Sequence, residues 1–545
     1  MRFALALNVI LSFASAASAD DPKQTVFPRR MLFIHIADYL YLRPLTHATP
    51  DGKDYVRDAA NQLASGFNIP TVKGDNQLFV LSDTGPANLA LPTRDVLAKT
   101  FDSFCATTRP QDRVVIYFGV HALEKDGKAF IAPIDGDPNV PSTLLPVEDV
   151  YAKLKELKAA QKVVIWDVCR TNPERASRRR DPGPMTPALV KALRAAPAGV
   201  QVLVSCSPGE HSLEYSFYRG AEVFAGSAFL HALCRASTDH NSATKSSPAE
   251  AIPVEALHKM TEKSLVEVVK THGIVQKPTL TGIPPQPVEY DPKQAPAKRF
   301  PLPPFPKSAA EAKGILDELA IPPIVEMDRA PLGRLPFNEV ALKNYAADVS
   351  IDEIFQNAEK YPLRIATLRT IQTIRDVWPL HGKLQSGVAV INSPITDQKK
   401  KAVTSAQGIV AEATARLEVE LDGLLEVANK RANETPRWQL HYDFTLAELR
   451  LRLVVLSEYN RGLAHVKTET LPDLPKGATG WRLMPLAKLE GQRDVQKLFA
   501  DATDGFTTIA TEHANTPWGV LAKRSLAVLP GSHWEPVVLP KKEPK

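Results

Sequence analysis

Cysteine is scarce in this chain of 545 residues, which contains only four. So few cysteines in a chain of this length exclude a disulfide-rich scaffold. No cysteine or histidine pair has the spacing of zinc ligands, so we expect no metal site of that kind. Cys105 and Cys234 lie in helical patterns, where a cysteine usually packs as a small hydrophobic residue. Cys169 and Cys206 remain as the cysteines of chemical interest.

Long hydrophobic runs and dense clusters of one charge are also missing. The net charge of +5 is small, and no basic face interleaved with aromatic residues is present, which argues against a nucleic-acid partner. The apolar run 4–17 is too short to span a bilayer, and it ends at the small residues Ala17, Ser18 and Ala19. We therefore expect residues 1–19 to be a signal peptide and the protein to be exported to the periplasm or beyond; a frayed N-terminal helix is the alternative. We predict no cofactor, and the sequence leaves a calcium requirement open.

Apolar runs alternate with helical patterns from Arg29 to about Gly273. Five short β-branched or aromatic runs predict strands at 31–36, 78–81, 114–118, 163–166 and 202–205. Helical patterns lie between them at 54–65, 92–104, with Thr93 as N-cap, and 147–157. This alternation predicts an α/β fold, a doubly wound and mostly parallel sheet, in a domain at residues 27–274.

The rest of the chain has a different composition. Ten prolines lie between residues 275 and 310, where they predict a stiff linker. Residues 311–545 carry long helical patterns, including 405–432 and 493–513, and predict an all-α domain. One apolar stripe at alternating spacings of four and three is formed by Tyr442, Leu446, Leu449, Leu453 and Leu456. One role that we consider for this domain is to bind a protein partner.

Two of the predicted strands lead into residues able to do chemistry. Strand 114–118 leads to His121, and strand 163–166 leads to Cys169. The reactive crevice of an open α/β sheet lies outside the carboxyl ends of its strands. A cysteine attacks an amide carbonyl as a thiolate, so it needs an imidazole to take its proton. We predict a His121/Cys169 dyad, with the N–H groups of Ala122 and Cys169 stabilising the oxyanion; taken singly, either side chain has an ordinary explanation as a packed residue.

Three blocks of this sequence resemble the caspase-like family (peptidase C14, related to metacaspases). Residues 117–122 and 126–135 resemble the segment between its Ser-Gly-His-Gly and Leu-x-Pro-x-Asp motifs. Residues 167–170, Asp-Val-Cys-Arg, resemble the Asp-x-Cys-Arg block that carries the nucleophile, and residues 205–214 resemble the Ser-Thr-x-Pro-Gly-x-x-Ser-x-Arg segment. The resemblance covers residues 28–240. It implies a caspase-like fold and a cysteine endopeptidase.

The departures from the family pattern bear on activity. Gly119 and Val120 stand where the family has Ser-Gly, and Ala122 replaces the second glycine beside the histidine. Alanine keeps the N–H donor but disfavours a positive φ, so the oxyanion site could be altered. The second hypothesis is therefore a catalytically silent caspase-like scaffold that binds a protein partner through its helical region.

Charge predicts the substrate preference. The family holds an acidic P1 side chain with a Gln two residues before the nucleophile and an Arg at the end of the third block, and this chain has Asp167 and Glu214 there. The resemblance thus implies a P1 pocket for Arg or Lys in a protein or peptide substrate. Ser205 and Asp38 are further pocket residues, although Asp38 is also explained as a turn residue and Asp167 as a support of the nucleophile loop. Cys206 lines the pocket or is a buried thiol.

A basic segment follows the predicted nucleophile at residues 175–184. Its prolines and glycine forbid a regular helix, and its charges argue against burial, so we expect a mobile surface loop. An enzyme specific for basic residues would find its own sites there, after Arg178 or Arg179 and less readily after Arg180, which precedes Asp181-Pro182. A solvated loop that is never cut is the alternative.

Overall fold

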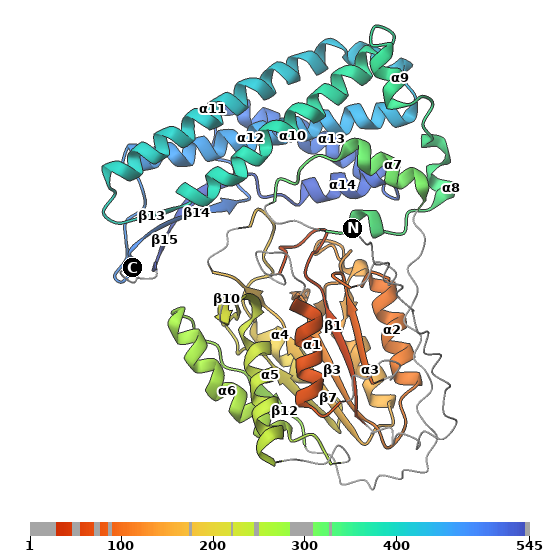
Figure 1. Ribbon diagram of the computed structural model, residues 1–545, viewed down its shortest axis with the longest axis vertical. Coiled ribbons are helices and arrows are strands. Elements are labelled where there is room, and N and C mark those ends of the chain that lie inside the picture. Colours follow the sequence, from red (N-terminus) through yellow and green to blue (C-terminus); the bar gives the residue numbers. More distant parts are fainter. Residues whose placement is uncertain are drawn as a thin grey trace, which may run out of the picture.

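The chain divides into an α/β part and a helical part (Figure 1). This computed structural model describes residues 29–45, 55–69, 77–85, 90–173, 177–219, 222–244, 250–283, 309–325 and 330–539. The expected signal peptide and residues 284–308 of the expected linker lie outside these ranges.

A six-stranded sheet forms the centre of the α/β part, in the order β12-β9-β7-β3-β1-β2. The strands are β1 (Arg29–His35), β2 (Leu78–Ser82), β3 (Arg113–Gly119), β7 (Gln161–Asp167), β9 (Val200–Val204) and β12 (Thr279–Thr281). The first five are parallel and match the five predicted strands, whereas β12 pairs with β9 in the antiparallel sense. Strand β12 lies inside the segment expected to be a linker, so the sheet extends beyond the predicted boundary at residue 274.

Helices cover both faces of this sheet. Met31, Phe33 and their neighbours pack against α1 (Tyr55–Gly66), α5 (Ala228–Thr244) and α6 (Val254–Thr271). The alternate residues Leu32 and Ile34 belong to the core that includes α2 (Arg94–Ala106), α3 (Val147–Glu156) and α4 (Pro187–Arg194). All residues of β1, β3 and β7 are buried, which explains their uninterrupted apolar runs. Thr93 is the N-cap of α2, as predicted, but its side chain makes no capping hydrogen bond.

Two small sheets extend from the carboxyl edge of the central sheet. One contains β4 (Ala122–Lys125), β5 (Lys128–Ile131) and β6 (Leu145–Pro146). The other contains β8 (Arg170–Thr171), β10 (Ser212–Arg219) and β11 (Glu222–Ser227). Each begins beside a predicted catalytic residue.

The helical part is built around one long helix, α12 (Pro436–Lys467). Around it lie α7 (Ala310–Leu319), α10 (Pro362–Val388), α11 (Asp397–Glu426), α13 (Arg493–Glu512) and α14 (Pro517–Leu526), with the short helices α8 (Glu339–Leu342) and α9 (Ile351–Gln356). Because other helices pack against it on several sides, α12 is buried well beyond the predicted stripe. A three-stranded antiparallel sheet of β13 (Val390–Asn392), β14 (Gly480–Leu486) and β15 (Gly531–Val537) adds a feature that the sequence analysis does not predict.

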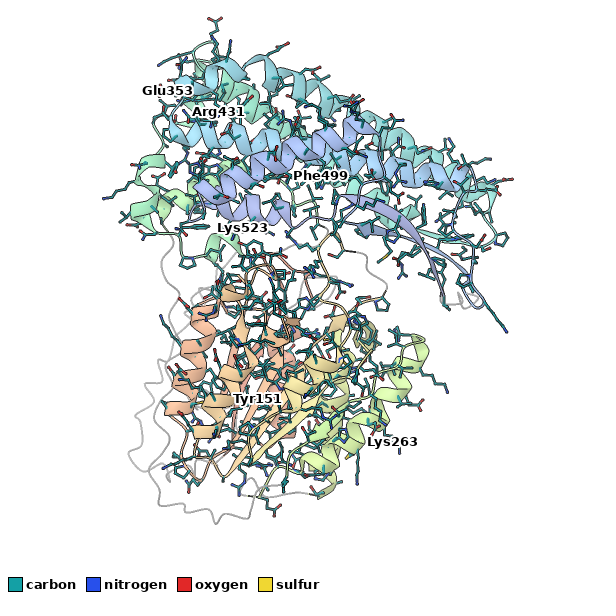
Figure 2. The ribbon with its side chains drawn as sticks, turned by 180° about the vertical axis from the view of Figure 1, so that it is seen from behind. Tyr151, Lys263, Glu353, Arg431, Phe499 and Lys523 are labelled. Atoms are coloured by element: carbon teal, nitrogen blue, oxygen red, sulfur yellow. The ribbon has the colours of Figure 1, made fainter. Side chains whose placement is uncertain are left out.

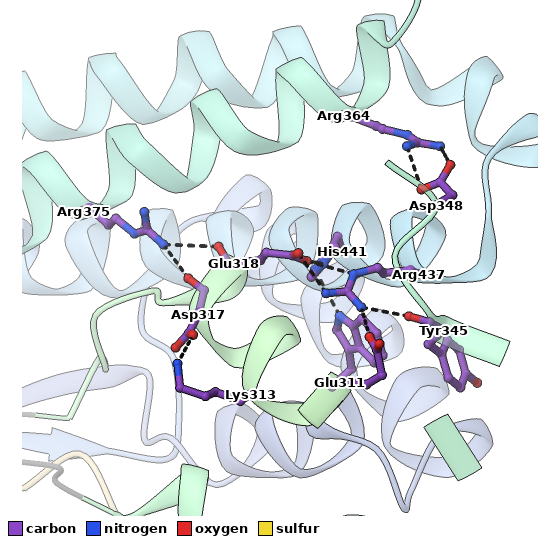
Figure 3. A network of polar contacts seen from close by, with 11 residues as sticks. Glu311, Lys313, Asp317, Glu318, Tyr345, Asp348, Arg364, Arg375, Arg437 and His441 are labelled. Atoms are coloured by element: carbon purple, nitrogen blue, oxygen red, sulfur yellow. Dashed lines mark hydrogen bonds and ion pairs between the residues drawn. The ribbon is translucent and has the colours of Figure 1, made fainter. Parts of the chain in front are cut away.

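A buried polar network joins α7 to α12 (Figure 3). Arg437 donates two hydrogen bonds to the carboxylate of Glu318, and His441 Nε2 lies 2.6 Å from the same carboxylate. Trp518 donates to His441 Nδ1, so the proton of a neutral His441 is on Nε2, facing Glu318. Burial opposes ionisation of Glu318, but the hydrogen bonds from His441 and Arg437 prevail and lower its pKa to about 2.

The helical part lies over the carboxyl edge of the central sheet (Figure 1). Lys523 of α14, on the side of the helical part that faces the sheet (Figure 2), forms an ion pair with Asp137, which follows β5. Arg334 donates to the carbonyl oxygen of Asp83, which follows β2. None of the helices in the described ranges is long and apolar enough to cross a membrane.

Candidate active site

Cys169 lies in a tight turn between β7 and β8. Its φ is +56°, a left-handed conformation that is uncommon for a residue other than Gly, Asn or Asp. Of the other described non-glycine residues with positive φ, Asn68 and Asp126 are of the tolerant kind, whereas Glu469 is not. Strained backbone of this sort costs of order 1–3 kcal/mol and is concentrated at functional sites. The strain distinguishes Cys169 from an ordinary packed cysteine.

His121 lies in the turn between β3 and β4 and is fully buried. Its Nε2 is 2.7 Å from the carbonyl oxygen of Arg43. A carbonyl only accepts, so Nε2 must carry the proton. The backbone N–H of His121 donates to the hydroxyl of Tyr39, whose ring packs against the imidazole at 4.6 Å between centroids. Orientation and tautomer are therefore both fixed.

The second ring nitrogen, Nδ1, is left as a proton acceptor. It is buried and has no hydrogen-bond partner. Burial lowers the pKa of His121, so the imidazole is neutral near pH 7. A neutral imidazole with an unengaged lone pair is what a general base requires.

The two predicted catalytic residues are both buried in this structure. Cys169 is only 2% exposed, and burial raises its pKa to about 12. Between these two described residues no hydrogen bond is formed. The thiol is therefore protonated in this conformation, and the dyad needs a local rearrangement before it can react.

The predicted oxyanion donors differ in their surroundings. The N–H of Cys169 has no acceptor among the described residues. Ala122 starts β4 opposite Ile131 and is not among the residues with positive φ, so alanine fits where the family has glycine. Packing explains why glycine stands at position 119. A Cβ there would lie 2.7 Å from the His35 ring, so the serine found in the family would not fit unless His35 moved.

Asp167 does not face an empty pocket. Its two carboxylate oxygens accept hydrogen bonds from the hydroxyls of Tyr117, at 2.7 Å, and Ser212, at 2.9 Å. It is completely buried. This arrangement agrees with the alternative in which Asp167 supports the loop that carries the nucleophile.

Glu214 is also engaged within the protein. Its carboxylate lies 2.9 Å from the guanidinium group of Arg170, which in turn lies 2.9 Å from His35 Nε2. Arg170, the residue after the nucleophile, thus holds one of the carboxylates that we expected to meet a basic P1 side chain.

The remaining predicted pocket residues have structural contacts. Ser205 exchanges hydrogen bonds with the backbone of Val168, and Cys206 is fully buried behind it. Asp38 follows β1, and its N–H donates to the carboxylate of Asp83. The structure brings Ser205, Asp167 and Glu214 to the carboxyl edge beside Cys169.

The expected exposure of the basic loop is wrong for Arg178 and Arg179, which are 6% and 4% exposed. Arg178 donates to the carbonyl oxygens of Leu529, Pro530 and Gly531 and to the hydroxyl of Ser532, at 3.0–3.2 Å. Arg179 forms a β-bridge with Val528. Burial is possible because backbone carbonyls of the helical part replace the water around these charges. Arg180 is exposed as expected, and Arg175 lies outside the described residues.

Three residues of the site were missed by sequence reasoning. Arg43 donates to Thr171, Asn172 and Asp181, and so holds the loop after Cys169 against His121. Tyr39 orients His121, and Gln276 bonds both Ser205 and Ser212. For Tyr39 and Arg43 the only signal in the sequence was their position just past the end of β1, at the carboxyl edge. Gln276 had no such signal.

Metal-binding clusters of three or more His, Cys, Asp or Glu residues are absent from the described part of the chain. No curated protein matches the sequence. The family model of the caspase domain, peptidase C14, matches residues 32–286, just under half of the chain. That range spans the central sheet, His121 and Cys169, and it ends beyond β12. Residues 32–286 of this chain are therefore a caspase-like domain of the peptidase C14 family.

Proposed function

We propose that this protein is a cysteine endopeptidase in which Cys169 is the nucleophile and His121 the base. The hydrogen bond between His121 Nε2 and the Arg43 carbonyl carries the proposal. A histidine that only filled the core would gain from satisfying both nitrogens, whereas this one keeps Nδ1 available at the edge where Cys169 lies.

The reaction would proceed in two stages. His121 Nδ1 takes the Cys169 proton, and the thiolate attacks the scissile carbonyl carbon. The resulting oxyanion is met by the N–H groups of Cys169 and Ala122, each typically worth about 3–4 kcal/mol of transition-state stabilisation. His121 then returns the proton to the leaving amine, and water hydrolyses the thioester.

We infer that substrate binding or loop movement opens the site. The segment from Thr171 to Asp181 is held by Arg43 on the α/β side and by Arg178 on the helical side. Solvent that reaches Cys169 would lower the pKa of its thiol, because burial is the main cause of its elevation. In this proposal the helical part restrains the site or recruits the substrate.

A basic P1 residue remains the proposed preference. The negative charges of Asp167 and Glu214 both interact with the positive charge of Arg170. Those of Asp83 and Glu214 both interact with the Tyr39 hydroxyl group. Arg334 also interacts with Asp83, so three carboxylates face two guanidinium groups, and the excess negative charge favours Arg or Lys over Asp. Asp167 and Glu214 would act through this field, with Arg170 shifting when a P1 cation arrives.

Peptide hydrolysis tests the proposal. The purified chain should cleave fluorogenic peptides with P1 Arg or Lys and spare the matched P1 Asp peptide. Cys169→Ser and His121→Gln should each abolish cleavage, whereas Cys105→Ser, at a partly buried position in α2, should not. Hydrolysis that survives His121→Gln would reject the dyad.

A catalytically silent scaffold is the second candidate. The burial of Cys169, and the lack of a hydrogen bond between the described residues Cys169 and His121, favour it. It predicts no hydrolysis by the wild type, nor by a variant in which the Arg178 contacts are removed, although both fold. Turnover by either protein would exclude it.

A further inference from the structure

A groove of about 480 Å³ lies between the helical part and the carboxyl edge of the central sheet. The helical part contributes α13, α14 and the segment that leads into β15. The α/β part contributes Tyr41 from the loop after β1, residues 137–139 after β5, and Arg180 from the loop after the nucleophile. Binding sites are typically about 300–1,000 Å³ and occur preferentially between domains. The size and place of this groove therefore suit a ligand.

The groove has a buried apolar floor and an exposed rim. Tyr41, Ala510 and Val528 line it and are at most 8% exposed. Leu526 is 38% exposed, and Phe499 of α13 (Figure 2) is half-buried. An apolar side chain that enters from solvent buries its surface against these residues, which is favourable.

Arg180 determines the sign of the charge in the groove. Lys523 and Asp137 form an ion pair with each other at 4.0 Å, so their charges cancel. Arg180 is exposed and forms no ion pair with another residue of the described ranges. No other charged residue belongs to the described lining, which thus carries an excess of one positive charge. An acidic side chain is therefore attracted to the rim.

The groove is close enough to the proposed dyad for one peptide chain to reach both. The carbonyl oxygen of Arg180 accepts a hydrogen bond from the N–H of Arg43 at 3.1 Å, and the carbonyl oxygen of Arg43 lies 2.7 Å from His121 Nε2. Because only Arg43 separates these two contacts, the Arg180 carbonyl oxygen lies within about 10 Å of His121 Nε2. An extended chain covers about 3.3–3.6 Å per residue, so a residue about three or four positions from the scissile bond reaches the groove.

The two walls of the groove are also tied to each other. Leu529 and Pro530 line the groove, and their carbonyl oxygens accept hydrogen bonds from Arg178 at 3.0 Å and 3.2 Å. The N–H of Leu529 donates in return to the Arg178 carbonyl oxygen at 2.7 Å. The groove is thus formed before a ligand arrives, which lowers the entropic cost of binding.

We propose that this groove is an accessory subsite for the substrate chain. It holds an aromatic or large aliphatic residue next to an acidic one, about three or four positions from the scissile bond. The apolar side chain packs beside Phe499 and Leu526, and the carboxylate pairs with Arg180. The inference rests on the proposed peptidase function and adds a second determinant of specificity, most of which lies outside the matched caspase domain.

Peptide binding by the inactive Cys169→Ala chain tests the subsite without turnover. The probes are fluorescein-labelled decapeptides with P1 Arg and a Phe-Glu pair either at P4 and P3 or at P3′ and P4′. In one of these two placements the Phe-Glu peptide should bind at least about fivefold more tightly than the matched Phe-Lys peptide, measured by fluorescence anisotropy. The matched Ala-Glu peptide should also bind more weakly, because it lacks the apolar side chain.

Two pairs of variants, made in the Cys169→Ala chain, locate this binding in the groove. Arg180→Glu should reverse the preference to Phe-Lys, whereas Arg194→Glu, at the exposed end of α4, should keep the preference for Phe-Glu. Leu526→Gln should weaken binding of the Phe-Glu peptide at least about threefold. Leu425→Gln, at an exposed leucine of α11 that does not line the groove, should not.

Three results would overturn the proposal: equal binding of the Phe-Glu and Phe-Lys peptides in both placements, no binding of any peptide, or a preference for Phe-Glu that survives in Arg180→Glu. The proposed peptidase function fails separately. If the wild type hydrolyses no peptide while the Cys169→Ala chain still prefers Phe-Glu, the dyad is rejected and the groove stands as a peptide-binding site. Hydrolysis of P1 Arg peptides that is indifferent to the Phe-Glu pair in both placements rejects the subsite alone.

Discussion

The guanidinium group of Arg170 lies 2.9 Å from the carboxylate of Glu214, and each side chain is only 1% exposed. Arg170 directly follows the proposed nucleophile, so this ion pair ties the nucleophile turn to β10. The protein itself thus supplies a cation to a carboxylate that was expected to bind the substrate. A buried pair of this kind is costly to break from one side, because the other charge stays behind.

Replacing Glu214 should change specificity. In Glu214→Gln, Arg170 loses its ion-pair partner and the site loses one of its carboxylates, so the attraction for a P1 cation weakens. We expect the ratio of kcat/KM for P1 Arg over P1 Leu peptides to fall at least about tenfold, or 1.4 kcal/mol. Asp126→Asn removes the same charge from the exposed β4–β5 turn and should leave the ratio unchanged. An unchanged ratio in Glu214→Gln would contradict this role.

Removing the Arg178 side chain should release the basic loop. Its hydrogen bonds to residues 529–532 hold that loop on the helical part. In Arg178→Ala we expect trypsin to cut after Arg179 or Arg180 at least about tenfold faster than in wild type. Arg180→Ala, which also removes one cleavage site but from an exposed residue, is the control. Equal rates in the two variants would show that Arg178 does not restrain the loop.

The Arg178 contacts that hold the basic loop should also prevent self-cleavage. Wild-type protein should stay intact between residues 177 and 181, because Arg178 and Arg179 are buried and cannot enter a P1 pocket. The Arg178→Ala variant should cut itself there, and Arg178→Ala combined with Cys169→Ala should not. Mass spectrometry of the new termini distinguishes these outcomes, and cleavage in the double variant would point to a contaminating protease.

Gly119 tests the packing beside His121. Because a Cβ would meet His35 at 2.7 Å, Gly119→Ala should lower the free energy of unfolding by about 1–3 kcal/mol. Gly408→Ala, inside α11 and with open surroundings, should instead stabilise the protein by about 0.5–1 kcal/mol. Denaturant titration measures both, and an unaltered stability of Gly119→Ala would mean that His35 moves aside at no cost.

The stability of the helical part should fall in acid. Glu318 has a pKa of about 2 when folded and about 4.3 when unfolded, so the unfolded state binds more protons between these values. Stability of about 3 kcal/mol, fully present above pH 4.5, is therefore lost as the pH falls towards 2. The lowered pKa of His441 acts in the same direction, beginning below about pH 6.5. Glu318→Gln should flatten the dependence below pH 4.5, whereas Glu426→Gln, at an exposed position, should not.

The sequence predicts those parts of the site that local pattern determines. Buried parallel strands are recognised from continuous apolar runs, and their ends carry His121 and Cys169 to the same edge. The extra sheet of the helical part was not predictable in this way. Strand β13 has only three residues and lies far from β14 in the chain, so neither has a partner within the local sequence.

Contacts between distant segments account for the remaining differences. The charges of Arg178 argued for exposure, yet acceptors more than 350 residues away make its burial possible. Arg43 does not belong to a recognisable sequence motif. It holds the loop after Cys169 only because the loop after β1 meets the loop after β7. Asp167 lies two residues before Cys169 in the sequence, but its engagement by Tyr117 and Ser212 depends on the neighbouring strand and on β10.

Covalent labelling tests the central claim most directly. The purified chain is treated with an acyloxymethyl ketone bearing P1 Arg, and the modified residue is located by mass spectrometry. The account predicts one adduct, on Cys169, which forms in the wild type, forms faster in Arg178→Ala, and is absent from His121→Ala. An adduct on Cys206, or labelling of Cys169 at the same rate without His121, would contradict the proposed dyad.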